Sequence, residues 1–295
     1  MDNTLIFSLF DETVLADTLS SQLTIEKGSA EIRYFPDGET YVRIDSDVQN
    51  KTILLIAPLD RPDQKIVPLF FLAETLKKSG AKKICLISPY LPYMRQDKQF
   101  KPGEAVTSVL FAKLLSSFID VLITIDPHLH RINALSDIYS IPTITLHATQ
   151  AIAEWIAKNI SSPLIIGPDE ESAQWVSDIA KKIDAPYAII KKIRYGDRRV
   201  SISIPEINAD DKTPVLIDDI VSTGTTMATV IQSLAAKQFQ KPIAIVVHAL
   251  FSRETEKNLL RAGAEKIISC NTISHFSNTI DISDLLLESL KNLLR

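Results

Sequence analysis

The sequence predicts an α/β fold built from parallel sheets that are flanked by helices. Short apolar runs rich in β-branched residues are bounded by turn residues and alternate with helical patterns along the chain. These runs are apolar at nearly every position, so both faces of the sheets should be covered. At 295 residues, with 45% hydrophobic and 23% charged content, the chain is long enough for two packed domains.

The elements follow one another in a regular order. Strands are expected at 53–57, 84–87, 121–125, 164–166, 215–217, 243–247 and 266–269. Helices are expected at 67–79, 106–118, 149–159, 172–182, 225–237 and 254–262, with a closing packing helix at 282–294. Each half then contains its own strands and crossovers, which predicts domains at 1–145 and 146–295 with ligands at the carboxyl ends of the strands.

Composition excludes several classes of protein. A net charge of -4 argues against a general affinity for nucleic acid. Cys85 and Cys270 lie in apolar segments without metal-ligand spacing, so both are expected to be buried thiols of a reducing compartment. There is no basic leader, and no apolar run approaches the roughly 20 residues of a membrane span. We expect a cytoplasmic protein without a membrane partner.

One loop carries the clearest chemical signal. The strand at 215–217 runs into Asp218 and Asp219, then into Ser222, Thr223, Gly224, Thr225 and Thr226, and then into a helix. Backbone N-H groups at a helix N-terminus attract phosphate, and the carboxylates suit the vicinal hydroxyls of a ribose. For an isolated pair of acids, ordinary helix capping would be the alternative. The whole pattern favours a phosphoribosyl site.

Glycine motifs of other nucleotide folds are missing from the sequence. Its eight glycines form neither a Walker A loop nor a Gly-x-Gly-x-x-Gly fingerprint. A nucleotide, if one is bound, is therefore bound by other elements.

Two segments in the first half are candidates for that role. Phe35, Pro36, Asp37, Gly38 and Glu39 form a turn by local chemistry. The loop after the strand at 84–87 contains Arg95, Gln96 and Asp97. Arginine offers a planar fork for phosphate oxygens and glutamine a donor and acceptor for a base edge, although a solvated polar loop is the alternative.

Two further positions suggest metal or phosphate contacts. His128 follows the strand at 121–125, and Asp169 follows the strand at 164–166. A histidine at such a position is a ligand or a buried core residue, and for His130 the core interpretation is favoured. The carboxylate of Asp169 suits Mg²⁺, which prefers oxygen ligands and shares them with phosphates.

The segment 191–199 concentrates positive charge in an otherwise acidic chain, with five cations in nine residues. Such a run is either a solvated surface or a lid that closes over a polyphosphate and neutralises charge developing on it. The residues alone leave both interpretations open.

Together these segments resemble the ribose-phosphate diphosphokinases, also called phosphoribosyl pyrophosphate synthetases, in order and over nearly the whole chain. The resemblance implies two similar type I phosphoribosyltransferase-like domains, each a mainly parallel sheet flanked by helices. It implies an enzyme of nucleotide biosynthesis that transfers the diphosphoryl group of ATP to the C1 hydroxyl of ribose 5-phosphate, with Mg²⁺ as cofactor. A homodimer or higher homo-oligomer is implied as well.

The resemblance also implies residue roles. Catalysis is assigned to Lys192 and Arg194, and metal binding to His128 and Asp169. The residues implied to bind ATP, in part across a dimer interface, are Phe35, Asp37, Glu39, Arg95, Gln96, Asp97 and His128. Those implied to bind ribose 5-phosphate are Asp218, Asp219, Ser222, Thr223, Gly224, Thr225 and Thr226.

The chain departs from the commonest bacterial pattern at Glu170, Glu171 and Ser222, and in the stretch after His128. These departures resemble archaeal-type members. Two alternatives stay open at this point: a type I phosphoribosyltransferase, and a non-catalytic regulatory subunit of a synthetase.

Overall fold

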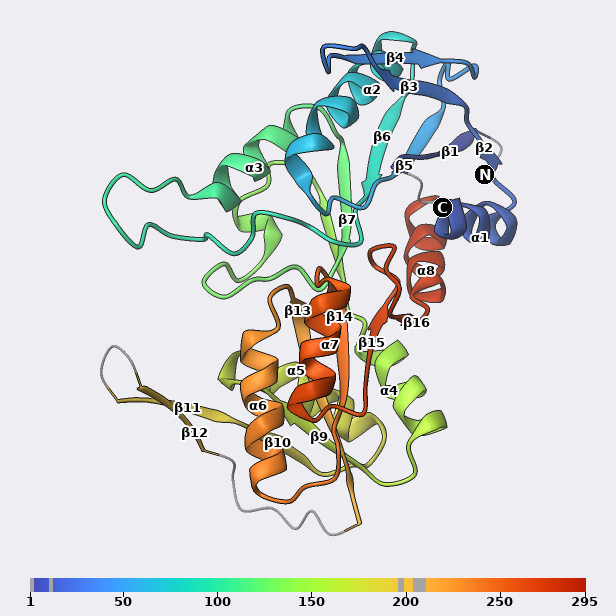
Figure 1. Ribbon diagram of the computed structural model, residues 1–295. Coiled ribbons are helices and arrows are strands. Elements are labelled where there is room, and N and C mark those ends of the chain that lie inside the picture. Colours follow the sequence, from blue (N-terminus) through green and yellow to red (C-terminus); the bar gives the residue numbers. More distant parts are fainter. Residues whose placement is uncertain (1–2, 11–12, 196–198, 204–210) are drawn as a thin grey trace. The chain divides into compact units, whose positions relative to one another are not determined.

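The computed structural model describes residues 3–10, 13–195, 199–203 and 211–295, and for residues 13, 191–195 and 199–203 it describes the backbone alone. The chain forms two compact units. Unit 1 comprises Met1–Leu146 and Ser283–Arg295, and unit 2 comprises His147–Ile282. Each unit is built on a parallel sheet with helices on both faces, as the sequence predicts (Figure 1).

Unit 1 contains a six-stranded sheet in the order β2-β1-β5-β6-β7-β8, in which all paired neighbours run parallel. Its strands are β1 (Thr4–Ser8), β2 (Glu26–Lys27), β5 (Thr52–Ile56), β6 (Lys83–Ile87), β7 (Val121–Ile125) and β8 (Thr143–Leu146). Its helices are α1 (Thr13–Leu23), α2 (Ile66–Lys78), α3 (Thr107–Ser116) and α8 (Ser283–Leu293), with 3-10 turns η1 (Pro62–Gln64) and η2 (Leu135–Asp137). Helices α2 and α3 cover one face, and α1 and α8 contact each other on the opposite face (Figure 1).

Unit 2 contains a second six-stranded parallel sheet, in the order β10-β9-β13-β14-β15-β16. Its strands are β9 (Pro163–Gly167), β10 (Tyr187–Ile189), β13 (Thr213–Val221), β14 (Ile243–Ala249), β15 (Lys266–Cys270) and β16 (Asn278–Ile280). Its helices are α4 (Thr149–Asn159), α5 (Ala173–Lys182), α6 (Thr225–Ala236) and α7 (Arg253–Ala262), with the 3-10 turn η3 (Glu170–Ser172). Helices α6 and α7 contact each other, as do α4 and α5.

The two units repeat one topology. In each sheet the second strand along the chain lies at the edge, beside the first, and the remaining strands follow in sequence order. An antiparallel hairpin is inserted after the edge strand in both units: β3 (Ala30–Tyr34) with β4 (Thr40–Ile44), and β11 (Lys191–Tyr195) with β12 (Arg199–Ser203). The hairpins therefore occupy equivalent places in the two halves of the chain.

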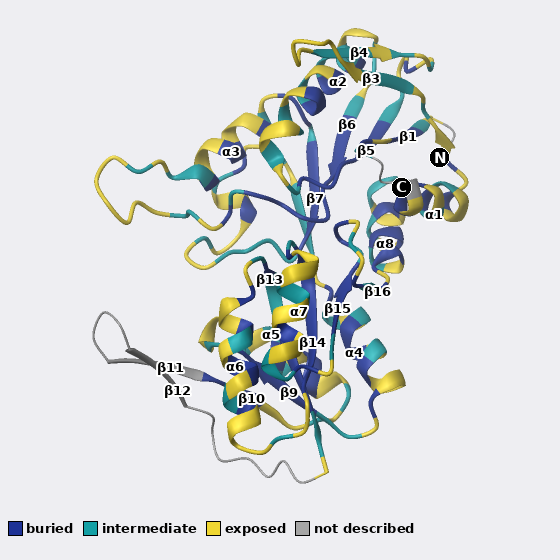
Figure 2. Ribbon diagram, viewed as in Figure 1, coloured by how far each residue is buried: buried dark blue, intermediate teal, exposed yellow. Residues whose placement is uncertain are grey.

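Burial follows the predicted apolar runs (Figure 2). Strands β5, β6, β7 and β14 are buried along almost their whole length, because helices cover both faces of each sheet. Cys85 and Cys270 are buried free thiols, as expected. Burial raises the pKa of the Cys85 thiol to about 11.

Two features of the fold differ from the sequence-based expectation. Residues 283–295 belong to unit 1, although they follow unit 2 in the chain. Leu286 and Leu290 of α8 are buried and α8 packs on α1, so tertiary packing decides the membership of this helix. Strand β13 also extends through Asp218 and Asp219 to Val221, because its backbone stays paired with β14 beyond the apolar run.

Candidate active site

Two consecutive carboxylates lie within the carboxyl-terminal part of β13. The backbone N-H of Asp219 donates to Asp218 Oδ1 at 3.0 Å, and that of Ile220 donates to Asp219 Oδ1 at 2.7 Å. The pKa of Asp218 is raised well above its usual range, first by burial and then by the negative charges of Asp219 and Asp169. The sequence placed these acids at the end of a strand, and the structure adds Asp169 to the same electrostatic environment.

The turn after β13 begins helix α6. Gly224 is the N-cap residue and adopts a left-handed conformation with φ 71° and ψ 4°. A Cβ at this position would lie 2.8 Å from Thr255 Cγ2, so glycine is required for both its conformation and its size. Thr223 and Thr225 are exposed, and their hydroxyls lie 3.2 Å apart. The first N-H groups of an α-helix have no partners within the helix, so the start of α6, beside these hydroxyls, has the geometry that suits an anion.

Asp169 follows β9 and begins the turn η3. Its backbone carbonyl accepts a hydrogen bond from Ser172 Oγ at 2.7 Å, and its side chain is partly exposed. Gly167 allows this turn to pack closely, since a Cβ there would lie 2.3 Å from Ser172 Oγ. The carboxylate of Asp169 therefore lies on a fixed backbone at the carboxyl end of a strand.

The predicted turn at 35–39 is the tip of the β3-β4 hairpin in unit 1. The N-H of Phe35 donates to the Glu39 carbonyl at 2.8 Å, and that of Gly38 donates to the Phe35 carbonyl at 2.9 Å. Gly38 adopts φ 91°, and Asp37 Oδ1 accepts from the N-H of Glu39 at 3.2 Å. Phe35 is 41% exposed, and Asp37 and Glu39 are exposed as well. The turn presents an aromatic ring and two acids to solvent.

The loop of Arg95, Gln96 and Asp97 is tied to the segment that carries His128. The Asp97 side chain is only 1% exposed and pairs with Arg131, whose Nη1 lies 2.9 Å from Asp97 Oδ1. The backbone N-H of Arg131 also donates to Asp97 Oδ2 at 3.2 Å. Arg95 is exposed, whereas the carboxylate of Asp97 is occupied within the protein. Asp97 therefore ties its loop to the segment of Arg131. The sequence did not single out Arg131.

His128 and His130 contact each other after β7. Their Nε2 atoms share a hydrogen bond, so one ring donates and the other accepts, and their ring centroids lie 3.9 Å apart at 89°. The expectation that His130 is a core residue was wrong: His130 is exposed, because β7 ends at Ile125 and the chain leaves the core there. The spacing of two residues on an extended segment was the signal for this pair.

The catalytic residues implied by the resemblance, Lys192 and Arg194, lie on strand β11. In the backbone register Lys192 pairs with Ile202 and Arg194 with Val200. Their side chains lie outside the described part of the structure.

Within the described residues, no group of three or more His, Cys, Asp and Glu side chains is arranged to hold a metal ion. The negative charges of Asp219 and Asp169 nevertheless both act on the Asp218 carboxyl, so oxygen donors are concentrated there. This donor type fits Mg²⁺, which commonly completes its coordination with waters and substrate phosphates.

Among the described residues no helix is long and apolar enough to cross a bilayer.

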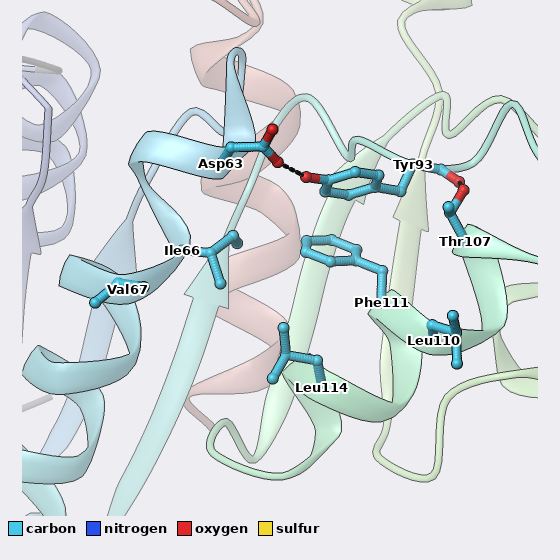
Figure 3. A pocket seen from close by; sticks show the side chains of 8 residues that line it. All are labelled: Asp63, Ile66, Val67, Tyr93, Thr107, Leu110, Phe111 and Leu114. Atoms are coloured by element: carbon cyan, nitrogen blue, oxygen red, sulfur yellow. Dashed lines mark hydrogen bonds between the residues drawn. The ribbon is translucent and has the colours of Figure 1, made fainter. Parts of the chain in front are cut away.

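A hollow of about 360 Å³ between α2 and α3 in unit 1 has mainly apolar walls (Figure 3). Tyr93 crosses one end of it, donates a hydrogen bond to Asp63 and lies 4.8 Å from the Phe111 ring centroid. Burial and the contact with Asp63 raise the pKa of Tyr93 to about 12, so the phenol stays a donor. Thr107 Oγ1 donates to the Tyr93 carbonyl at 3.2 Å. These contacts fix both ends of the loop that carries Arg95, and none of the residues expected to bind ATP lines the hollow.

Comparison with known proteins identifies the family. Residues 4–118 match the model of the N-terminal domain of ribose phosphate pyrophosphokinase, and residues 134–285 match that of the phosphoribosyl transferase domain. A ribose-phosphate pyrophosphokinase of Saccharolobus solfataricus is 34% identical over 93% of this chain and 96% of its own length. The chain belongs to the ribose-phosphate pyrophosphokinase family.

Other members of the ribose-phosphate pyrophosphokinase family agree with this assignment. One from Methanobrevibacter smithii is 30% identical and covers 95% of this chain and 96% of the relative. The crystal structure of phosphoribosylpyrophosphate synthetase from Mycobacterium smegmatis matches with a TM-score of 0.85 and covers 99% of both chains. At 24% identity that structural match supports the fold. The expected resemblance and the two-domain fold are confirmed.

Proposed function

We propose that this chain is a ribose-phosphate diphosphokinase that makes 5-phosphoribosyl 1-diphosphate and AMP from ATP and ribose 5-phosphate. The observation that carries the proposal is the loop from Asp218 to Thr226, in which two carboxylates precede a left-handed glycine at a helix N-terminus. One such loop can bind both the hydroxyl end and the phosphate end of a sugar phosphate. Membership of a family whose curated relatives are named ribose-phosphate pyrophosphokinases supports it.

In this proposal unit 2 binds ribose 5-phosphate. The N-H groups at the start of α6, together with Ser222 and the hydroxyls of Thr223, Thr225 and Thr226, hold the phosphate. Asp218 and Asp219 accept hydrogen bonds from the ribose hydroxyls. Since burial and neighbouring charge disfavour the ionised form of Asp218, hydroxyl donors or a cation stabilise its carboxylate when substrate binds.

Unit 1 binds the nucleotide in the same proposal. Phe35 offers an exposed ring to the purine, while Asp37 and Glu39 accept hydrogen bonds. Arg95 and Gln96 contact phosphate and base, and Asp97 holds their loop to Arg131. We assign the loop an electrostatic and orienting role, because the transferred group carries most of the negative charge.

The C1 hydroxyl oxygen bonds to the β-phosphorus of ATP as the bond from that phosphorus to the α,β-bridging oxygen breaks. AMP leaves with the bridging oxygen, and the hydroxyl proton passes to solvent. We propose that Lys192 and Arg194 neutralise charge on the transferred diphosphoryl group. His128 and Asp169 would hold Mg²⁺, which supplies charge neutralisation at the phosphates when bound.

The decisive experiment is incubation of the purified protein with ATP, Mg²⁺ and ribose 5-phosphate. AMP released in step with phosphoribosyl pyrophosphate is the expected result, and it should cease when EDTA removes the metal. ADP as the nucleotide product would refute the diphosphoryl transfer. Pyrophosphate release that depends on an added base would identify a type I phosphoribosyltransferase, and inactivity with all substrates would favour a regulatory subunit.

A homodimer or higher homo-oligomer and a cytoplasmic location belong to the same proposal. Sedimentation equilibrium of the purified chain tests the first of these. A mass of 32.8 kDa, that of one chain, would contradict it.

A further inference from the structure

The outward face of the β3-β4 hairpin carries a continuous series of charged and aromatic side chains. Ala30, Ile32, Val42 and Ile44 of the opposite face pack against the core of unit 1. Because side chains alternate along a strand, Glu31 and Arg33 of β3 and Tyr41 and Arg43 of β4 share the outward face. We call Glu31, Arg33, Tyr41, Arg43 and Asp45 the hairpin ladder. The pair Arg33 and Tyr41 lies at the end of the hairpin ladder next to the turn that carries Phe35.

The hairpin ladder is joined by contacts from end to end. Arg43 Nε lies 2.8 Å from Asp45 Oδ1, and Arg43 Nη2 lies 3.3 Å from Glu31 Oε2. The other oxygen of Glu31, Oε1, lies 3.3 Å from Arg33 Nε. The register pairs Glu31 with Arg43 and Arg33 with Tyr41. Glu31 therefore bridges two guanidinium groups and fixes the position of Arg33.

Arg33 in turn contacts both aromatic rings near the turn. Its Cζ lies 4.1 Å from the Tyr41 ring centroid and 4.8 Å from that of Phe35. The two rings meet edge to face, with centroids 6.1 Å apart and planes at 90°. Both distances from Arg33 fall within the range of a cation-π contact. An exposed phenylalanine beside a turn would otherwise have free rotamers, and these contacts restrict them.

We propose that Arg33 is a positioning residue for nucleotide binding, which it supports by holding the Phe35 ring against Tyr41 in the orientation that receives the purine. The inference rests on the proposed function, since it requires that Phe35 contacts the nucleotide. A ring already ordered in the free protein loses less conformational entropy on binding, so pre-organisation strengthens the affinity for ATP. The chemical step is not affected, because Arg33 touches only other side chains.

The test compares MgATP binding and steady-state kinetics for the wild type, Arg33→Ala and Arg33→Lys. Arg33→Ala should raise the KM and Kd for ATP about three- to tenfold, with kcat and the KM for ribose 5-phosphate within about twofold of wild type. Lysine keeps a cation over the rings but lacks the guanidinium fork, so Arg33→Lys should recover much of the loss. The matched control is Arg261→Ala, which removes an exposed arginine from α7 and should leave every constant unchanged.

A double-mutant cycle separates positioning from a general effect. Once Phe35→Ala has removed the ring, Arg33→Ala should add less than about twofold to the KM for ATP. An equal effect in both backgrounds, or no effect of either single substitution on ATP affinity, overturns the inference. If the wild type binds MgATP with Arg33-dependent affinity but releases no AMP, the proposed reaction fails while the positioning role stands.

Discussion

Replacing Gly224 by alanine should destabilise the loop from Asp218 to Thr226 for two reasons, one conformational and one steric. The first part is conformational, since a residue with a Cβ at φ 71° costs about 1 to 2 kcal/mol. The second is steric, because the new Cβ would lie 2.8 Å from Thr255 Cγ2 and 3.4 Å from Leu259 Cδ2. Overpacking of this kind costs roughly 1 kcal/mol or more. We expect Gly224→Ala to lower the free energy of unfolding by about 2 to 3 kcal/mol.

Tryptophan fluorescence in urea measures this effect, because both tryptophans, Trp155 and Trp175, lie in unit 2 with Gly224. The matched variant is Thr255→Ser, which removes Cγ2 but keeps the hydroxyl that contacts Ser252. The double variant Gly224→Ala with Thr255→Ser should recover about 1 kcal/mol, the steric part. Kinetically, Gly224→Ala should raise the KM for ribose 5-phosphate about tenfold or more, since displaced N-H groups lose charge-assisted hydrogen bonds, and leave the KM for ATP within about twofold.

Two results would refute this reasoning. An unfolding midpoint and a KM for ribose 5-phosphate equal to wild type would show that the loop does not need glycine. Failure of Thr255→Ser to recover any stability would show that the loss is conformational alone.

Three other predictions concern the remaining parts of the site and the core. Lys192→Ala should lower kcat by orders of magnitude with a modest effect on the KM for ribose 5-phosphate, and near-normal turnover in the coupled AMP assay would contradict the assigned role. Arg131→Ala leaves the buried Asp97 carboxylate without its guanidinium, so the free energy of unfolding measured in urea should fall by about 1 to 2 kcal/mol. Adding Asp97→Asn to Arg131→Ala should reduce this loss. An unchanged unfolding midpoint would show that the pair is not stabilising. Cys85 and Cys270 should resist Ellman's reagent in the native protein and react with it in denaturant, since both are buried and burial raises the pKa of Cys85 to about 11. Rapid labelling of the native protein would contradict their burial.

The repeated topology gives unit 1 a segment equivalent to the loop from Asp218 to Thr226. The β13-α6 turn of unit 2 corresponds to the segment between β5 and α2 in unit 1. There the Lys65 ammonium donates to the Pro58 carbonyl at 2.7 Å and pairs with Asp60 at 2.5 Å. The segment thus satisfies its own cation, and no acid pair ends β5. The equivalent segments of the two units therefore contain different polar groups.

Local sequence determined the features that depend on neighbours in the chain. Apolar runs and helical periodicity predicted most of the buried strands and the ends of the expected helices within one or two residues, as at α4, found at Thr149–Asn159, because burial of both sheet faces leaves a continuous apolar signal. Strand β1 and helix α1 were not predicted, although β1 is buried at Leu5, Ile6 and Phe7. The loop from Asp218 to Thr226 could also be predicted, because its acids, its glycine and its helix are adjacent in the chain. The hairpin strands β3 and β4 were missed, since none of their residues is fully buried and polar side chains interrupt the apolar ones.

Only the tertiary structure decided the contacts between distant segments. Asp97 and Arg131 are 34 positions apart, so no local pattern could show that the carboxylate is buried against a guanidinium. Helix α8 joins unit 1 because its buried leucines find α1 there, and chain order carries no information about that choice. The same holds for Arg33, whose place between two rings depends on the register of β3 against β4. Sequence determined the chemistry available to this protein, and packing determined which groups meet.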